Sequence, residues 1–108
     1  MTHHKVPMTL KRDETKEIWK KINHDWKLDF DHRVILQKAL EFLERSMEAR
    51  EILDRDGLCF ETAQGVIKKH PAIEIQKIAD GQFLMAWRML NLGVEAPLGI
   101  GRPGTGGH

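Results

Sequence analysis

Histidine is a common metal ligand, and the 108-residue chain contains six of them. His24, His32 and His70 are isolated from one another, and each falls on a different predicted element. None has a histidine four residues away, which is the spacing of a helical zinc site. We therefore expect no structural or catalytic metal. The other histidines lie near the chain ends and are His3, His4 and His108.

The single cysteine, Cys59, is the candidate thiol nucleophile. A cysteine nucleophile needs a neighbouring base and an oxyanion site. Cys59 instead lies between Leu58 and Phe60 in a β-prone run, where cysteine usually acts as a small apolar residue. One thiol makes no internal disulfide, so nothing indicates an oxidising compartment. We predict no enzymatic activity and no cofactor.

Carboxylates recur on one predicted helix, where paired acids would suit general acid-base chemistry. They fall on its polar side, so we expect solvated carboxylates rather than a catalytic dyad. The acids concerned are Glu41, Glu44, Glu48, Asp54 and Asp56.

Basic residues gather near the start of the chain. The formal net charge is only +1, so bulk charge gives no argument for nucleic acid. Residues 1–27 nevertheless hold seven Lys/Arg against four Asp/Glu, whereas residues 28–56 hold five against eight. A basic cluster can neutralise phosphates without reading bases, although a solvated helix surface has the same composition. The candidate DNA-binding residues are Lys5, Lys11, Arg12, Lys16, Lys20 and Lys21.

The elements that carry these residues begin with an arm and a short helix. Residues 1–12 have no stable apolar period, so we expect a flexible basic arm there. A helix is predicted over 13–26, because Ile18, Ile22 and Trp26 recur every four residues and share one face. The three tryptophans of the chain all fall on apolar faces, which is typical of core or interface anchors.

Two longer amphipathic helices are predicted over 30–56 and 71–92. Pro71 suits the first turn of the second of them. Gly81 lies inside that helix at a cost of roughly 1 kcal/mol relative to alanine, and a close helix crossing would explain it. Both apolar faces are too wide for one partner helix, which favours contact with a neighbouring subunit. The faces comprise Leu36, Leu40, Leu43 and Met47, and then Ile75, Ile78, Ala79, Phe83, Ala86, Trp87 and Leu90.

A small β-hairpin is predicted over 58–69, with Gly65 in its tight turn. The fold class is therefore mainly α: an N-terminal helix and a long antiparallel helical hairpin, with the β-hairpin inserted between its two helices, in a ring-forming oligomer. Residues 13–94 make one helical oligomerisation core. Residues 95–108 are rich in glycine and are expected to form a flexible tail.

No apolar run approaches the ~20 residues of a membrane span, and the start of the chain lacks a hydrophobic signal core. We expect a cytoplasmic protein that makes no membrane contact.

The stretch from Asp56-Gly57 through the hairpin to His70-Pro71-Ala72 resembles the small terminase subunits of tailed bacteriophages. Members of that family show "DG" at a helix end, two short strands around a glycine turn, and then "HPA" or "NPA" opening a long helix. That helix ends in "LGL" before a proline, here Leu92-Gly93-Val94 with Pro97 after it. The resemblance covers roughly residues 14–97.

The resemblance implies a ring-forming, non-enzymatic subunit of a viral DNA-packaging motor, from a phage or a phage-derived gene-transfer system. Its partners would be copies of itself, double-stranded DNA held weakly by charge, and the large terminase subunit with its ATPase and nuclease. It would act in the cytoplasm of the bacterial host and is not expected in the mature particle. The alternatives are a small helical DNA-binding transcriptional regulator and a protein-binding adaptor. In the tail, the expected large-subunit contacts are Leu98, Ile100 and Arg102.

Overall fold

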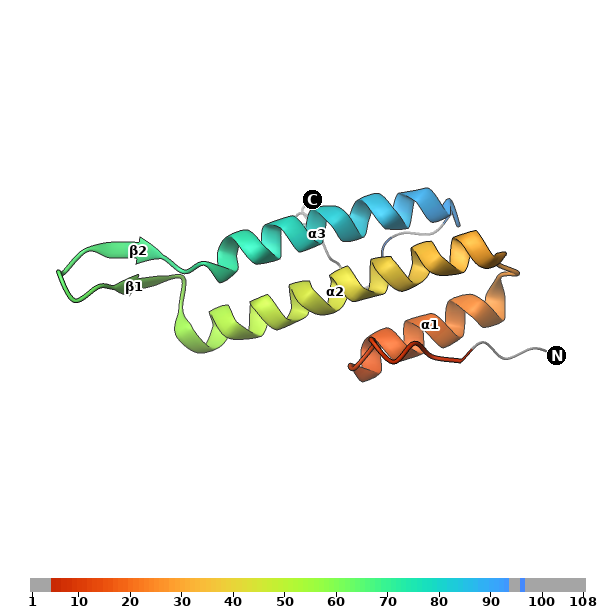
Figure 1. The fold of residues 1–108 in the computed structure, drawn as a ribbon, viewed down its shortest axis with the longest axis horizontal. Helices are drawn as coiled ribbons and strands as arrows, with labels where there is room; N and C mark the ends of the chain where they lie inside the picture. Colours follow the sequence, from red (N-terminus) through yellow and green to blue (C-terminus); the bar gives the residue numbers. More distant parts are fainter. Residues whose placement is uncertain (1–4, 94–95, 97–108) are drawn as a thin grey trace, which may run out of the picture.

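The computed structural model describes residues 5–93 and Ala96, and it is mainly helical with one small β-hairpin (Figure 1). This confirms the predicted order of the elements, and the helix bounds agree with the prediction to within two residues. The elements are α1 (Asp13–Asp25), α2 (Phe30–Asp56), β1 (Cys59–Glu61), β2 (Ile67–Lys69) and α3 (Ala72–Leu90).

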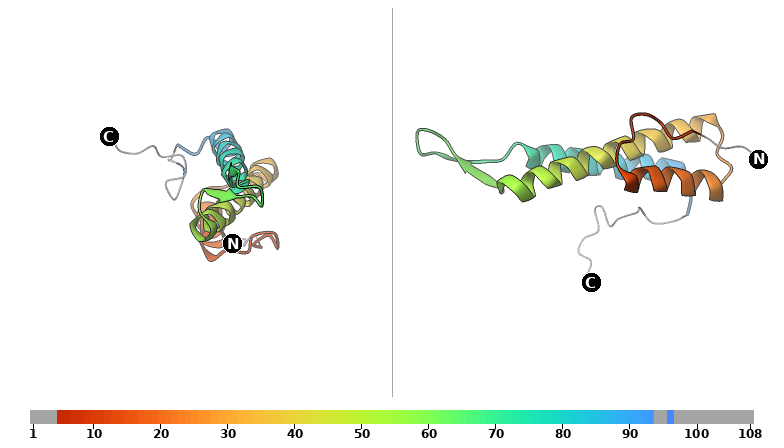
Figure 2. Two further views of the ribbon diagram at one scale, coloured as in Figure 1. Left: turned by 90° about the vertical axis from the view of Figure 1, so that its left-hand side faces the viewer. Right: turned by 90° about the horizontal axis from the view of Figure 1, so that it is seen from below.

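Helix α2 lies between α1 and α3, and it runs antiparallel to α3 along most of the length of that helix (Figure 1). The β-hairpin extends beyond the helices at one end, and the turned views in Figure 2 show the same projection. The molecule is accordingly elongated, with principal extents of 61 × 35 × 20 Å. Among the described residues, no helix is long and apolar enough to cross a membrane.

The main core lies between α2 and the second half of α3, with α1 added on the other side of α2. Phe83 on α3 is completely buried, and its ring lies 5.8 Å from that of Trp87. Trp19 and Ile22 bring α1 into the same cluster. The predicted anchor role is therefore met by Trp19 and Trp87, while Trp26 is half-buried beside the cluster.

Local capping explains where α2 and α3 begin and end. Asp29 precedes α2 and its side chain accepts a hydrogen bond from His32 N at 2.8 Å, which satisfies one backbone donor at the helix start. Gly57 follows α2 at a φ of +87°, a value that favours glycine. Helix α3 ends at Asn91, which is left-handed at a φ of +52° because asparagine tolerates this conformation, and Gly93 two positions later also has a positive φ of +78°.

The apolar face of α3, which the sequence predicts to be continuous, has a buried part and an exposed part in the structure. Phe83 and Trp87 face α2, whereas Ile75 and Ile78 are about half exposed. Gly81 is also exposed, and an added Cβ would meet no atom within 4 Å. Among the described residues, no element therefore makes the expected close crossing at Gly81.

The predicted arm differs most from expectation, because its second half packs onto the helices. Leu10 is only 2% exposed and belongs to the main core. Leu10 N also donates to Pro7 O at 3.1 Å, which closes a turn just before α1. Burial of one apolar side chain and closure of a turn therefore order the part of the arm that is next to α1.

The end of the predicted core also extends further than expected. Ala96 is half-buried against the main core cluster, although it falls within the predicted flexible tail of residues 95–108. Apart from Ala96, the tail lies outside the described residues.

Candidate nucleic-acid interface

The basic arm is held against α2 by a carboxylate from that helix. Glu44 Oε2 accepts hydrogen bonds from Lys11 N at 2.7 Å and Arg12 N at 2.8 Å. It also accepts a short hydrogen bond from the buried Thr15 hydroxyl. Lys11 and Arg12 are the two residues just before α1, so their N–H groups have no partner within that helix. Glu44 therefore acts as a cap supplied by another helix, and Glu41 adds a 2.7 Å hydrogen bond from Thr9 Oγ1.

Arg12 is committed to an ion pair with Glu51. Its Nη1 and Nη2 donate to the two carboxylate oxygens at 2.8 and 2.7 Å, in a two-point geometry that suits a guanidinium. The hydrogen bond with Glu51 raises the pKa of Arg12 above its ordinary value, and the same bond lowers the pKa of Glu51. Of the six candidate DNA-binding residues, Arg12 thus has its charge most directly balanced by an acid.

Lys11 and Lys16 are brought together by the fold. Both line a shallow groove whose other walls are the apolar residues of the arm, including Met8 and Leu10. Lys11 is exposed and Lys16 is half-buried, so each ammonium group can reach solvent beside the groove. At this groove, a cation from the arm and a cation from α1 therefore lie on the same surface.

The remaining candidate lysines are spread along the outer side of α1 and the arm. Lys20 lies 3.5 Å from Glu17, and Lys21 lies 3.1 Å from Asp25. Both pairs are largely exposed, so they hold the ammonium groups only weakly. Lys5 is exposed at the start of the described chain. The fold therefore gathers Lys11 and Lys16 but leaves the other cations dispersed.

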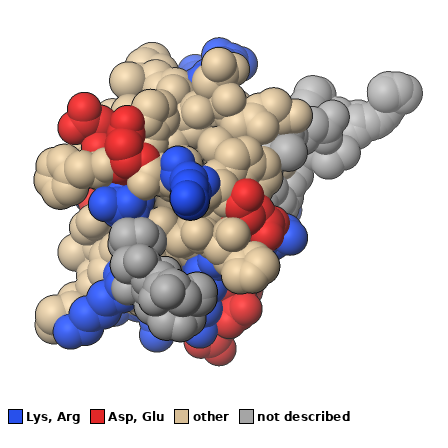
Figure 3. All heavy atoms as spheres, turned by 90° about the vertical axis from the view of Figure 1, so that its right-hand side faces the viewer, with Lys and Arg blue, Asp and Glu red and all other residues tan. Residues whose placement is uncertain are grey.

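Charge is mixed rather than single-signed on the end of the molecule away from the hairpin. Figure 3 shows Lys/Arg and Asp/Glu side chains interspersed with uncharged surface on that face. Charges of opposite sign that are interspersed largely cancel, so such a surface attracts phosphates only weakly. Weak binding driven by charge is what this arrangement can support.

Two of the acids predicted to be solvated, Glu41 and Glu44, instead hold the segment before α1. Glu51, which was not in that set, does the same through Arg12. The partners are separated by 32 to 39 positions in sequence, so no local spacing signals the contact. Among these acids, Asp54 remains on the exposed side, 3.2 Å from Arg50.

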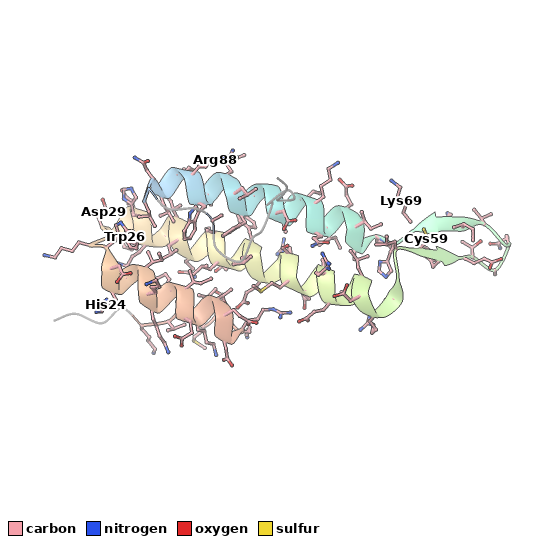
Figure 4. The ribbon with its side chains drawn as sticks, turned by 180° about the vertical axis from the view of Figure 1, so that it is seen from behind. His24, Trp26, Asp29, Cys59, Lys69 and Arg88 are labelled. Atoms are coloured by element: carbon pink, nitrogen blue, oxygen red, sulfur yellow. The ribbon has the colours of Figure 1, made fainter. Side chains whose placement is uncertain are left out.

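The three histidines among the described residues each lie beside one carboxylate rather than in a shared cluster. His24 contacts Asp25 and His32 contacts Asp29. Figure 4 labels His24 and Asp29 near the α1–α2 corner. His70 Nε2 lies 3.1 Å from Asp56. Within residues 5–93 and at Ala96, no three His, Cys, Asp or Glu side chains are grouped to hold a metal. His3, His4 and His108 lie outside the described residues.

Cys59 is exposed on β1, not buried as a small apolar residue would be. It lies opposite Lys69 of β2, near the base of the hairpin (Figure 4). The tail residues Leu98, Ile100 and Arg102 lie outside the described residues, so their predicted partner contact has no geometry here.

No protein-family model, no curated protein and no solved structure matches this chain.

Proposed function

We propose that this chain is the small subunit of a terminase, the DNA-packaging motor of tailed phages and of phage-derived gene-transfer systems. In this role it forms a ring without enzymatic activity, gathers double-stranded DNA, and delivers it to a large subunit that carries the ATPase and nuclease. The sequence resemblance supports the proposal. So does the position of its motif, since Gly57 ends α2, the two strands follow, and Pro71 precedes α3.

The observation that most directly supports self-assembly is a second apolar stripe on α3, apart from the one that faces α2. Ile75, Ile78, Met85 and Met89 are between 46% and 64% exposed. With Gln82, they follow alternating steps of three and four residues, which is the spacing of a helix seam that packs on another helix. A run of large apolar side chains along one helix is typical of a protein interface. It supports a contact with a neighbouring copy.

Light scattering after size exclusion tests the assembly directly. A closed ring of many copies is expected at micromolar concentration, because a head-to-tail contact that closes gives a cyclic oligomer. Ile78→Glu should shift the protein to smaller species, since it places a charge in the stripe. Lys77→Glu is the control, because it places the same carboxylate one residue away on the polar side of α3 and changes the net charge by even more. A wild-type dimer would favour a DNA-binding regulator, and a monomer would favour an adaptor.

DNA binding in this proposal is electrostatic and repeated around the ring. Lys5, Lys11, Lys16, Lys20 and Lys21 contribute directly, and Arg12 contributes when released from Glu51. A ring places these cations in a band, which raises the local potential without any new residue.

The salt dependence of affinity measures how many phosphates the protein neutralises. Lys16→Gln combined with Lys20→Gln should lower the slope of log affinity against log salt by about 0.9 for each phosphate that is no longer neutralised. Lys38→Gln with Lys77→Gln removes the same charge from outside the basic segment and should leave the slope near that of the wild type. An unchanged slope in the first pair would exclude Lys16 and Lys20 as DNA-binding residues.

The large-subunit contact is assigned to the tail, through Leu98, Ile100 and Arg102. Because Ala96 packs on the core, the informative deletion starts after it and removes residues 97–108. That variant should keep the ring and lose stimulation of the large subunit. Full stimulation by the truncated ring would move the contact elsewhere, with the β-hairpin as the next segment to test.

A further inference from the structure

The β-hairpin has two open edges whose backbone groups point away from it. Thr62 N donates to Val66 O and His70 N donates to Leu58 O, each at 2.8 Å. In an antiparallel pair, residues alternate between those that bond across the pair and those whose N–H and C=O point outward. By this alternation, Phe60 and Lys68 belong to the residues that bond across the pair. The outward residues are Cys59 and Glu61 on β1, and Ile67 and Lys69 on β2.

The hairpin is also poorly covered for a structure of its size. All six strand residues are exposed. The large apolar side chains in and beside the strands, Leu58, Phe60, Val66 and Ile67, are between 42% and 64% exposed. An isolated two-stranded hairpin is at best marginally stable in water, and a third strand or a packed face is needed. Added strands on both edges would supply the missing hydrogen bonds and cover these apolar side chains.

Charge distinguishes between the possible strand partners. Within the strands, β1 carries the acid Glu61, whereas β2 carries Lys68 and Lys69. Pairing β1 with another β1 would bring two Glu61 side chains near each other, and pairing β2 with β2 would gather four lysines. Like charges on paired strands are destabilising, whereas opposite charges stabilise. The favourable partner for β1 is therefore a strand with the charge of β2.

We propose that β1 of one copy pairs antiparallel with β2 of the next copy, so that the hairpins of an assembly join into one continuous sheet. This inference rests on the proposed ring, and it identifies a contact that would join each copy to the next in the same orientation. Each copy offers one β1 edge and one β2 edge, so the contact is head to tail and can be repeated until the ring closes. The projection of the hairpin past the helices leaves both edges accessible (Figure 2).

The native Cys59 gives a direct probe of this pairing. The double variant Cys59→Ser/Lys69→Cys carries its only thiol on β2. When it is assembled together with wild-type protein and mildly oxidised, a covalent dimer is expected, because facing residues on paired strands lie within disulfide reach. Cys59→Ser/Ile67→Cys tests the register shifted by two residues. Either protein alone should give no dimer, since like strands in this sheet are separated by an unlike one.

The control is Cys59→Ser/Lys77→Cys, which moves the thiol to α3 and should not couple with Cys59 of a wild-type neighbour. A ring by light scattering with no mixed dimer at position 67 or 69 would overturn the inference and leave the proposed function standing. Dimers from wild-type protein alone, or from the Lys69→Cys variant alone, would also overturn it, because they report like strands in contact. A monomeric wild-type protein would contradict the proposed function as well as this inference. The failure of the inference alone can therefore be distinguished from the failure of both.

Discussion

Arg12 and Glu51 form a two-point ion pair across 39 positions of sequence, with nitrogen–oxygen distances of 2.8 and 2.7 Å. The pair joins the residue just before α1 to the last third of α2. The charge of Arg12, a candidate DNA-binding residue, is therefore balanced by an acid on α2. The same acid-rich side of α2 also holds the backbone of Lys11 and Arg12 through Glu44.

Glu51→Gln is expected to strengthen DNA binding, because it releases the Arg12 guanidinium for phosphates. Glu48→Gln changes the net charge equally on the same helix and is the control, so only the excess effect of Glu51→Gln is informative. Titrating labelled duplex DNA at fixed salt measures both. In an Arg12→Ala background the excess should disappear, and its persistence there would show that Arg12 does not bind the DNA.

Glu44→Gln is expected to lower the free energy of unfolding by about 1–3 kcal/mol, the usual cost of disturbing hydrogen bonds at a partly buried site. All three hydrogen bonds end on Glu44 Oε2, and an uncharged amide oxygen accepts them more weakly than a carboxylate, so the attachment of the start of α1 is weakened. Urea denaturation followed by tryptophan fluorescence measures the change, because Trp19 lies on α1. Glu48→Gln should stay within about 0.5 kcal/mol of wild type. An equal loss in both variants would argue against the capping role.

Gly81→Ala is expected to stabilise the isolated chain and to weaken the assembly. Alanine is favoured over glycine by about 1 kcal/mol inside a helix, and the added Cβ meets no atom within 4 Å. The variant should therefore unfold at higher denaturant concentration when diluted to monomer. Gly81 lies one turn from both Ile78 and Met85, so a neighbour that crosses closely there would be displaced by the methyl group. Equilibrium sedimentation across a dilution series measures that effect, and unchanged assembly would place the neighbour's closest approach away from Gly81.

Asp56 is expected to make stability at the hairpin base depend on acid. The hydrogen bond from Arg55, and then the one with His70, lowers the pKa of Asp56 from 3.8 to about 2. Because the folded pKa is below the unfolded value, the ionised carboxylate stabilises the fold above about pH 4. That contribution is lost as the pH falls toward about 2.

Asp56→Asn should accordingly be less stable than wild type near neutral pH, and the difference should shrink between about pH 4 and 2. Denaturation at several pH values measures it, with Asp54→Asn as a neighbouring control on the same helix. A difference that stays constant throughout this acid range would mean that Asp56 acts by packing rather than by charge.

Local sequence determined the elements and their limits. The apolar period predicted three helices. Pro71 marked the start of α3, Gly57 marked the end of α2, and Gly65 marked the hairpin turn. These features depend on residues within one turn of each other, because helix capping and tight turns are governed by short-range backbone geometry. The same reasoning missed Asn91 as the end of α3, since glycine was the expected left-handed residue.

Tertiary structure decided which side of each element is used. The apolar face of α3 looked continuous in sequence, yet packing against α2 buries Phe83 and leaves Ile75 exposed, because one neighbouring helix covers only part of a helix circumference. Glu44 was expected to be a solvated acid and Glu51 was not singled out at all, and only the fold brings them to Lys11 and Arg12. Contacts between residues so far apart along the chain leave no periodic trace in a sequence, since they depend on where whole helices lie and not on the spacing within one.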